Sequence, residues 1–125
     1  MKDQVLSVKQ MQRLMELGVD VSKASMCYVF FESDGSKYAD IVVHDESCYE
    51  MACMNPMPTF TLQDMINLMP NNVKYEGKSY YLSIDKKFVG YIDDMDVEDC
   101  VLESESNILE NTYKVLVWLA EHKYI

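Results

Sequence analysis

The segment Ser104–Ile125, SESNILENTYKVLVWLAEHKYI, decides the fold. Its apolar and small side chains recur at helical spacing, at Ile108, Thr112, Val115, Leu116, Leu119 and Ala120. The apolar stripe is widened by Leu109, Tyr113, Val117 and Trp118. A helix that is apolar over most of its circumference is surrounded by the rest of a core. The pattern therefore predicts a sheet whose inner face is covered by this helix.

Length and charge limit the classes of protein. The chain has 125 residues, which suits one domain, residues 1–125, with a core that needs no metal or disulfide. Its net charge is −10, from 21 acidic and 11 basic residues. This charge repels nucleic-acid phosphates and anionic membrane surfaces, so we expect neither nucleic acid nor membrane as a direct partner.

Cysteine usage and the N-terminal sequence predict a cytoplasmic protein. No segment approaches the ~18 consecutive apolar residues of a membrane span. The first ten residues, MKDQVLSVKQ, lack the hydrophobic stretch of a secretory signal. Without an export signal, we expect reduced thiols at Cys27, Cys48, Cys53 and Cys100.

Two further helices have clear start and stop signals. Ser7 followed by Gln10 is a capping box, and Gly18 suits the left-handed position after the helix end. A second helix begins after Thr61, with Asp64 three residues later, and ends at Pro70.

Strands are predicted at 26–31, 38–43, 73–75, 80–84 and 88–92, with hairpin turns at Asp34-Gly35 and Glu76-Gly77. In the fourth strand, alternation places Tyr80, Leu82 and Ile84 inward and Tyr81, Ser83 and Asp85 outward. The element order is α-β-β-α-β-β-β-α. We therefore predict a two-layer α+β fold, with an antiparallel sheet of about five strands packed against helices.

Two groups of residues are weak candidates for a metal site. His44, Cys48 and Cys53 lie in a stretch without clear periodicity, but their spacing lacks the close cysteine pairs that zinc prefers. The second group, Asp94, Asp96, Glu98 and Glu105, partly matches a calcium loop. That loop needs glycine at its sixth position, where this chain has Asp99. We predict no metal, no cofactor and no catalytic residue.

The chain has more apolar and aromatic residues than a single core would bury, and this favours an interaction surface. The strand 26–31 is apolar on both faces, with Cys27, Val29 and Phe31 on one of them. Methionines, which adapt to partner surfaces, gather before the second helix. We name six candidate interaction residues: Phe31, Met51, Met54, Met57, Tyr81 and Tyr91.

Four segments carry a resemblance: LSVKQMQRLMELGVDVSKASM, PTFTLQDMINLMP, YYLSIDKKFVGYI and ENTYKVLVWLAEHKYI. In this order they cover most of the chain, and they resemble a group of small proteins of gut Bacteroidetes and their phages or mobile elements. The shared signatures are structural ones, namely helix caps, a proline stop and the apolar helix with Trp118. The group has no established activity, so the resemblance implies no substrate, cofactor or catalytic residue. Residues 44–57 match no pattern in it.

The sequence thus predicts a non-enzymatic cytoplasmic interaction or accessory module, self-associating as a homodimer or binding another protein. An alternative is an acidic decoy that mimics nucleic acid and occupies a DNA-binding protein, because net charge and the phage-like resemblance both suit that role. A third possibility is a small metal-binding protein or enzyme built on His44, Cys48 and Cys53.

Overall fold

The structure is a computed structural model that describes residues 4–33, 35–43, 56–93 and 98–125. The described helices are α1 (Val8–Glu16), α3 (Leu62–Leu68) and α4 (Ile108–Glu121). The strands are β1 (Met26–Ser33), β2 (Ser36–Val43), β3 (Met57–Thr59), β4 (Asn72–Tyr75), β5 (Lys78–Ile84), β6 (Val89–Ile92) and β7 (Asp99–Glu103). None of the described helices is long and apolar enough to cross a membrane.

The α+β class is confirmed, but the described strands form two antiparallel sheets instead of one sheet of about five strands. One sheet has the order β2-β1-β3 and the other the order β4-β5-β6-β7. The sequence analysis missed β3 and β7. Strand β3 is only three residues long and contains Pro58, so it has no readable period. Strand β7 begins at Asp99, within the acidic segment 94–105 that partly matches a calcium loop.

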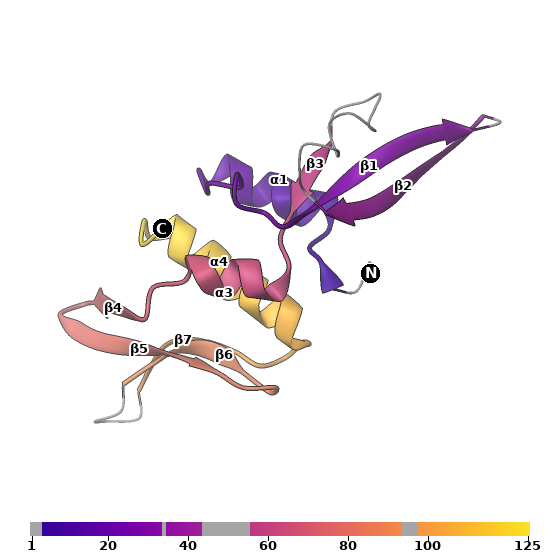
Figure 1. Cartoon of the computed structure of the whole chain (residues 1–125). Helices are drawn as coiled ribbons and strands as arrows, with labels where there is room; N and C mark the ends of the chain where they lie inside the picture. Colours follow the sequence, from indigo (N-terminus) through magenta and orange to yellow (C-terminus); the bar gives the residue numbers. More distant parts are fainter. Residues whose placement is uncertain (1–3, 34, 44–55, 94–97) are drawn as a thin grey trace.

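Helix α4 lies at the centre of the molecule, as its apolar circumference predicts. In Figure 1, α3 and α4 lie on one side of the four-stranded sheet, and α1 and the three-stranded sheet lie beyond the helices. The buried residues of α4 are Asn111, Thr112, Val115, Leu116, Leu119 and Ala120. The four apolar ones, Val115, Leu116, Leu119 and Ala120, belong to one core with side chains of α1, α3 and the four-stranded sheet, among them Met11, Met65 and Tyr91.

The two helix starts predicted at Ser7 and Thr61 are confirmed, and α4 has a cap of the same kind. The Ser7 hydroxyl accepts from Gln10 N at 3.2 Å, and Gln10 Oε1 accepts from Ser7 N at 2.9 Å. Thr61 and Asp64 form the same reciprocal pair at α3. At α4, Asn107 Oδ1 accepts from Glu110 N at 2.9 Å. Each side chain satisfies amide groups that the first helical turn leaves without a partner.

Both predicted hairpin turns and the alternation of β5 are also confirmed. Strands β1 and β2 pair with Ser33 opposite Ser36. Glu76 and Gly77 have φ of 51° and 81°, as the tight turn between β4 and β5 requires. Tyr80 is buried, whereas Tyr81 is 50% exposed on the outer face.

Two expectations about the first strand are corrected. Cys27 and Val29 are fully buried and pack with Val42, so this part of the strand face is already covered in a single chain. Cys27 is disulfide-bonded, so the prediction that all four cysteines are reduced is wrong for this residue. Cys100 is a free cysteine, and Cys48 and Cys53 lie outside the described residues.

Candidate functional site

The edge strands of the two sheets differ in how well they are protected against pairing with a strand of another molecule. Natural edge strands are kept short, carry proline or are interrupted by bulges. Strand β3 has three residues and a proline, β4 has four residues, and the pairing of β6 with β7 is irregular at Tyr91/Ile92. Strand β2 has eight residues in unbroken register with β1. It is therefore the long and regular edge among the described strands.

The outer edge of β2, which we call the β2 edge, faces away from the helices. In Figure 1 the β1–β2 hairpin extends beyond the body of the molecule, with β2 on its outer side. The amide of Ile41 donates to Asp40 Oδ1 of its own strand at 2.9 Å, so this N–H points away from β1. Because amide direction alternates along a strand, the N–H groups of Ala39 and Val43 point to the same side.

One face of this hairpin is apolar. Tyr28 lies opposite Ile41 and Phe30 opposite Ala39, so these four side chains share a face. Val43 continues it and is 60% exposed. Near the helices, the same face forms one wall of a cavity.

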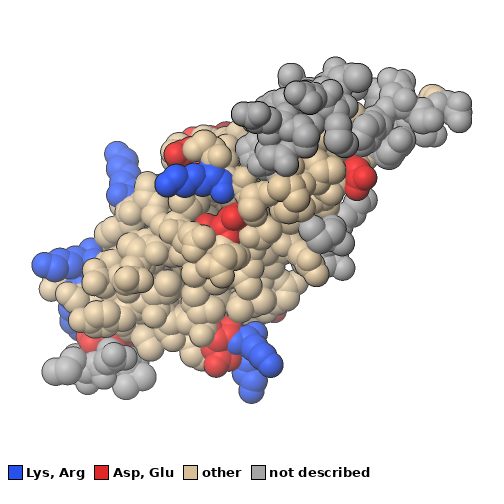
Figure 2. Space-filling view, viewed as in Figure 1, with Lys and Arg blue, Asp and Glu red and all other residues tan. Residues whose placement is uncertain are grey.

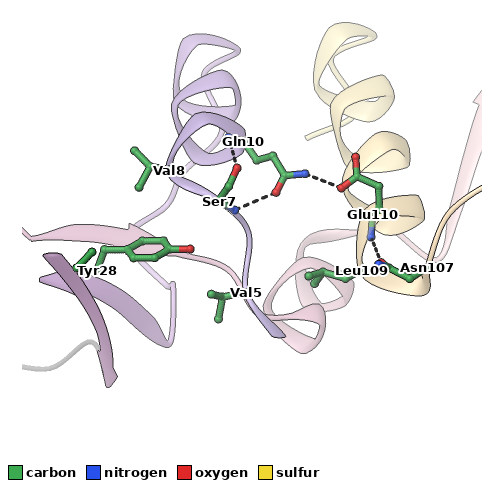
Figure 3. A pocket seen from close by; sticks show the side chains of 9 residues that line it. Val5, Ser7, Val8, Gln10, Tyr28, Asn107, Leu109 and Glu110 are labelled. Carbon is green, nitrogen blue, oxygen red and sulfur yellow. Dashed lines mark hydrogen bonds between the residues drawn. The ribbon is translucent and has the colours of Figure 1, made fainter. Parts of the chain in front are cut away.

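This cavity, which we call the hairpin cavity, has a volume of about 510 Å³. It lies between the hairpin and the N-terminal ends of α1 and α4 (Figure 3). Its apolar lining consists of Val5, Val8, Tyr28, Ala39 and Leu109. Its polar lining consists of Ser7, Gln10, Asn107 and Glu110. Pockets for small ligands have this size range and this mixture of apolar walls with a few polar groups.

Hydrogen bonds hold the polar side of the hairpin cavity in place. Gln10 Nε2 donates to Glu110 Oε2 at 2.7 Å, which joins the first turns of α1 and α4. Gln10 Oε1 already accepts from Ser7 N, so the amide group of Gln10 is fixed at both ends. The second carboxylate oxygen, Glu110 Oε1, makes no hydrogen bond within the described part of the chain.

The apolar wall is equally well anchored. The Tyr28 hydroxyl donates to the carbonyl oxygen of Leu6 at 2.9 Å, and the Thr59 hydroxyl donates to the same oxygen at 2.7 Å. Burial raises the pKa of Tyr28, so its hydroxyl stays protonated and remains a donor at neutral pH. Strands β1 and β3 are thus tied to the segment that enters α1.

Not all the interaction residues predicted from sequence lie at the surface. Tyr81 is exposed on the outer face of β5, and Met57 is half-buried in β3 against the core. Tyr91 is fully buried, and its hydroxyl donates to the carbonyl of Pro70 at 2.6 Å, so it offers no contact surface. Phe31 lies in β1, opposite Tyr38. Met51 and Met54 lie outside the described residues.

The candidate metal ligands are not brought together where the structure describes them. His44, Cys48, Cys53, Asp94 and Asp96 lie outside the described residues. Glu98 pairs with Lys78 Nζ at 2.6 Å, and exposed Glu105 is separated from it by β7. Within the described ranges, no three histidine, cysteine, aspartate or glutamate side chains are close enough to share a metal ion.

Two side chains that could be reactive, Cys100 and His122, are held in contacts that indicate a structural role. Burial, together with the Glu76 carboxylate, raises the pKa of Cys100 to about 11, so this thiol is protonated and weakly nucleophilic at neutral pH. His122 stacks on Trp118 with ring centroids 4.2 Å apart, and its Nδ1 lies 2.8 Å from the Trp118 carbonyl oxygen. Tyr75 and Tyr124 contact the same indole, so these rings pack mainly against each other.

Sequence reasoning missed both the β2 edge and the hairpin cavity. The cavity combines residues 5–10, 28, 39 and 107–110, which only the tertiary fold brings together. The edge depends on strand order, which a single sequence does not contain. The one local signal was the capping residues Ser7 and Asn107, since a helix start places polar groups at a defined point.

Comparisons of the chain with protein families, with curated proteins and with solved structures found no match.

Proposed function

We propose that the protein is a non-enzymatic interaction module that self-associates by pairing its β2 edge with the β2 edge of a second copy. The observation that carries this proposal is the length and regularity of β2 beside the shorter or interrupted edges of the other described strands. An exposed edge of this kind is a template for another strand, which main-chain hydrogen bonds hold in place.

A second copy of the chain is a suitable occupant of this edge. Two-fold symmetry makes the β2 strands antiparallel, and directly opposed residues must then lie on the same face of the joined sheet. A register with Ala39 on the symmetry axis satisfies this condition. It avoids placing Asp40 opposite Asp40, which would bring two carboxylates together. In this register Ala39 lies opposite Ala39 of the second copy, so the two apolar faces meet at this position, and Ile41 lies opposite Lys37.

The decoy function has less support. A protein that mimics nucleic acid should present a long regular stripe of carboxylates. In Figure 2, the described acidic residues of the visible face appear as separate spots among uncharged residues. We therefore keep the interaction module as the proposed function.

The cytoplasmic location remains a prediction, and one observation counts against it. Disulfides persist in oxidising compartments and are rare in the cytosol. The disulfide at Cys27 therefore favours an oxidising environment for this protein.

The proposal is tested with Ala39→Pro and sedimentation velocity over a range of protein concentrations. Proline removes the outward N–H of residue 39 and leaves the ladder to β1 intact. Each lost hydrogen bond contributes about 1 kcal/mol, and symmetry removes one from each copy. We therefore expect the Kd of the dimer to rise at least tenfold. Ala39→Val is the matched control, because it changes the side chain and keeps the N–H.

Circular dichroism should show that both variants keep the fold. Tyr81→Ser tests the other exposed surface, the outer face of β5. A wild-type protein that stays monomeric at high concentration would refute self-association. A dimer that is broken by Tyr81→Ser and not by Ala39→Pro would refute pairing through the β2 edge.

A further inference from the structure

The hairpin cavity has features of a ligand site that self-association does not require. Its volume, about 510 Å³, falls in the range of small-molecule pockets. Its two sides differ in character, with Val5, Tyr28 and Leu109 in the apolar wall and Gln10 and Glu110 on the polar side. Such a division fixes the orientation of a ligand that has one apolar and one polar end.

The charge in the cavity indicates what that polar end should be. Of the described residues that line it, Glu110 is the only Asp, Glu, Lys or Arg. Its Oε2 is held by Gln10, and its Oε1 is left to accept a further hydrogen bond. A carboxylate that is already oriented by a neighbour gives a strong, charge-assisted bond to a cationic donor.

The helix starts next to Glu110 do not supply an equivalent site for an anion. Asn107 Oδ1 accepts from the backbone N–H of Glu110, and Ser7 Oγ accepts from the backbone N–H of Gln10. Each helix start thus already has a side-chain acceptor for one of the N–H groups that an anion would use. An anion would also meet the Glu110 carboxylate at short range. The net charge of −10 further favours the approach of cations.

We propose that the hairpin cavity binds a small organic cation, a primary ammonium group on a short apolar stem. The ammonium group donates to the Glu110 carboxylate, and the stem runs past Leu109 and Val5 toward Tyr28 on the opposite side of the cavity (Figure 3). The aromatic ring of Tyr28 then contacts the far end of the stem. This inference does not depend on whether the protein self-associates.

The test uses n-hexylammonium, n-hexanol and n-hexanoate as probes, which share one stem and differ in charge. Binding is followed by amide chemical shifts in two-dimensional NMR of the full chain. We expect the ammonium probe to bind at least fivefold more tightly than the alcohol, and its affinity to fall with added salt. The largest shifts should come from residues 7–10 and 107–110.

Glu110→Gln removes the charge and keeps an oxygen that can accept from Gln10. It should weaken hexylammonium binding by roughly five- to tenfold and leave hexanol binding unchanged. Glu105→Gln is the matched control, because it removes the same charge from an exposed position before α4. Val8→Trp, which fills the cavity from its apolar side, should weaken all three probes.

Three results would overturn the proposal. Equal binding of hexylammonium and hexanol would show that Glu110 does not recognise the ligand. Preference for hexanoate would assign the cavity to anions through the helix starts. Shifts that spread over other surfaces, or that persist in Val8→Trp, would place binding outside the cavity.

Discussion

At the scale of single residues, Asn111 illustrates how a polar side chain can be essential inside an apolar helix. It is fully buried in α4. Its Oδ1 accepts from Ser106 N at 3.1 Å, and its Nδ2 donates to the Ser106 carbonyl at 2.9 Å. One side chain thus satisfies both backbone groups of the residue that connects β7 to α4. The sequence analysis missed this role, because the helical pattern identifies apolar positions and gives no hydrogen-bond partner for Asn111.

Asn111→Ala should lower the free energy of unfolding by about 2–3 kcal/mol, because it leaves the two backbone groups of Ser106 without their partner. Asn107→Ala is the control, since Asn107 is an exposed cap whose loss costs about 1 kcal/mol. Urea denaturation followed by far-UV circular dichroism measures both values. Equal losses in the two variants would show that water replaces Asn111 at Ser106.

At the scale of helices and strands, local sequence signals were sufficient to locate single elements. They were not sufficient to predict which distant strands pair. The capping pairs Ser7/Gln10 and Thr61/Asp64 act within one helical turn, so their residues identify the helix starts directly. The alternation of β5 is equally local. The division into two sheets is different, because Cys27 pairs with Val42 on one side and Pro58 on the other. The pairing of Cys27 with Pro58 joins strands that are about thirty residues apart in the chain, and the residues between them do not indicate which positions will be opposed.

The β4–β5 turn gives a prediction at this scale. Gly77→Ala should destabilise the protein by about 1 kcal/mol, because φ of 81° is unfavourable for a residue with a Cβ atom. Glu76→Asn should stabilise it by several tenths of a kcal/mol, since asparagine tolerates the φ of 51° better than glutamate. Thermal or urea denaturation measures both changes. If both variants destabilise the protein, the Glu76 side chain makes a contribution that outweighs its backbone conformation.

At the scale of the whole molecule, net charge and edge pairing act against each other. Two copies that associate bring together charges of −10 each, and this repulsion acts over the Debye length. That length is about 30 Å at 10 mM salt and about 8 Å at 150 mM salt. Main-chain hydrogen bonds at the β2 edge carry no net charge, so the pairing itself depends little on salt.

Dimerisation should therefore strengthen as salt is added, by several-fold between low and physiological ionic strength. Sedimentation velocity of the wild-type chain measures this dependence. The double variant Asp99→Asn/Glu105→Gln alters two exposed carboxylates and changes the net charge from −10 to −8. It should dimerise more tightly than wild type at low salt and equally at high salt. Dimerisation that weakens with salt would instead indicate an interface held by opposite charges, which two copies joined through the β2 edge would not provide.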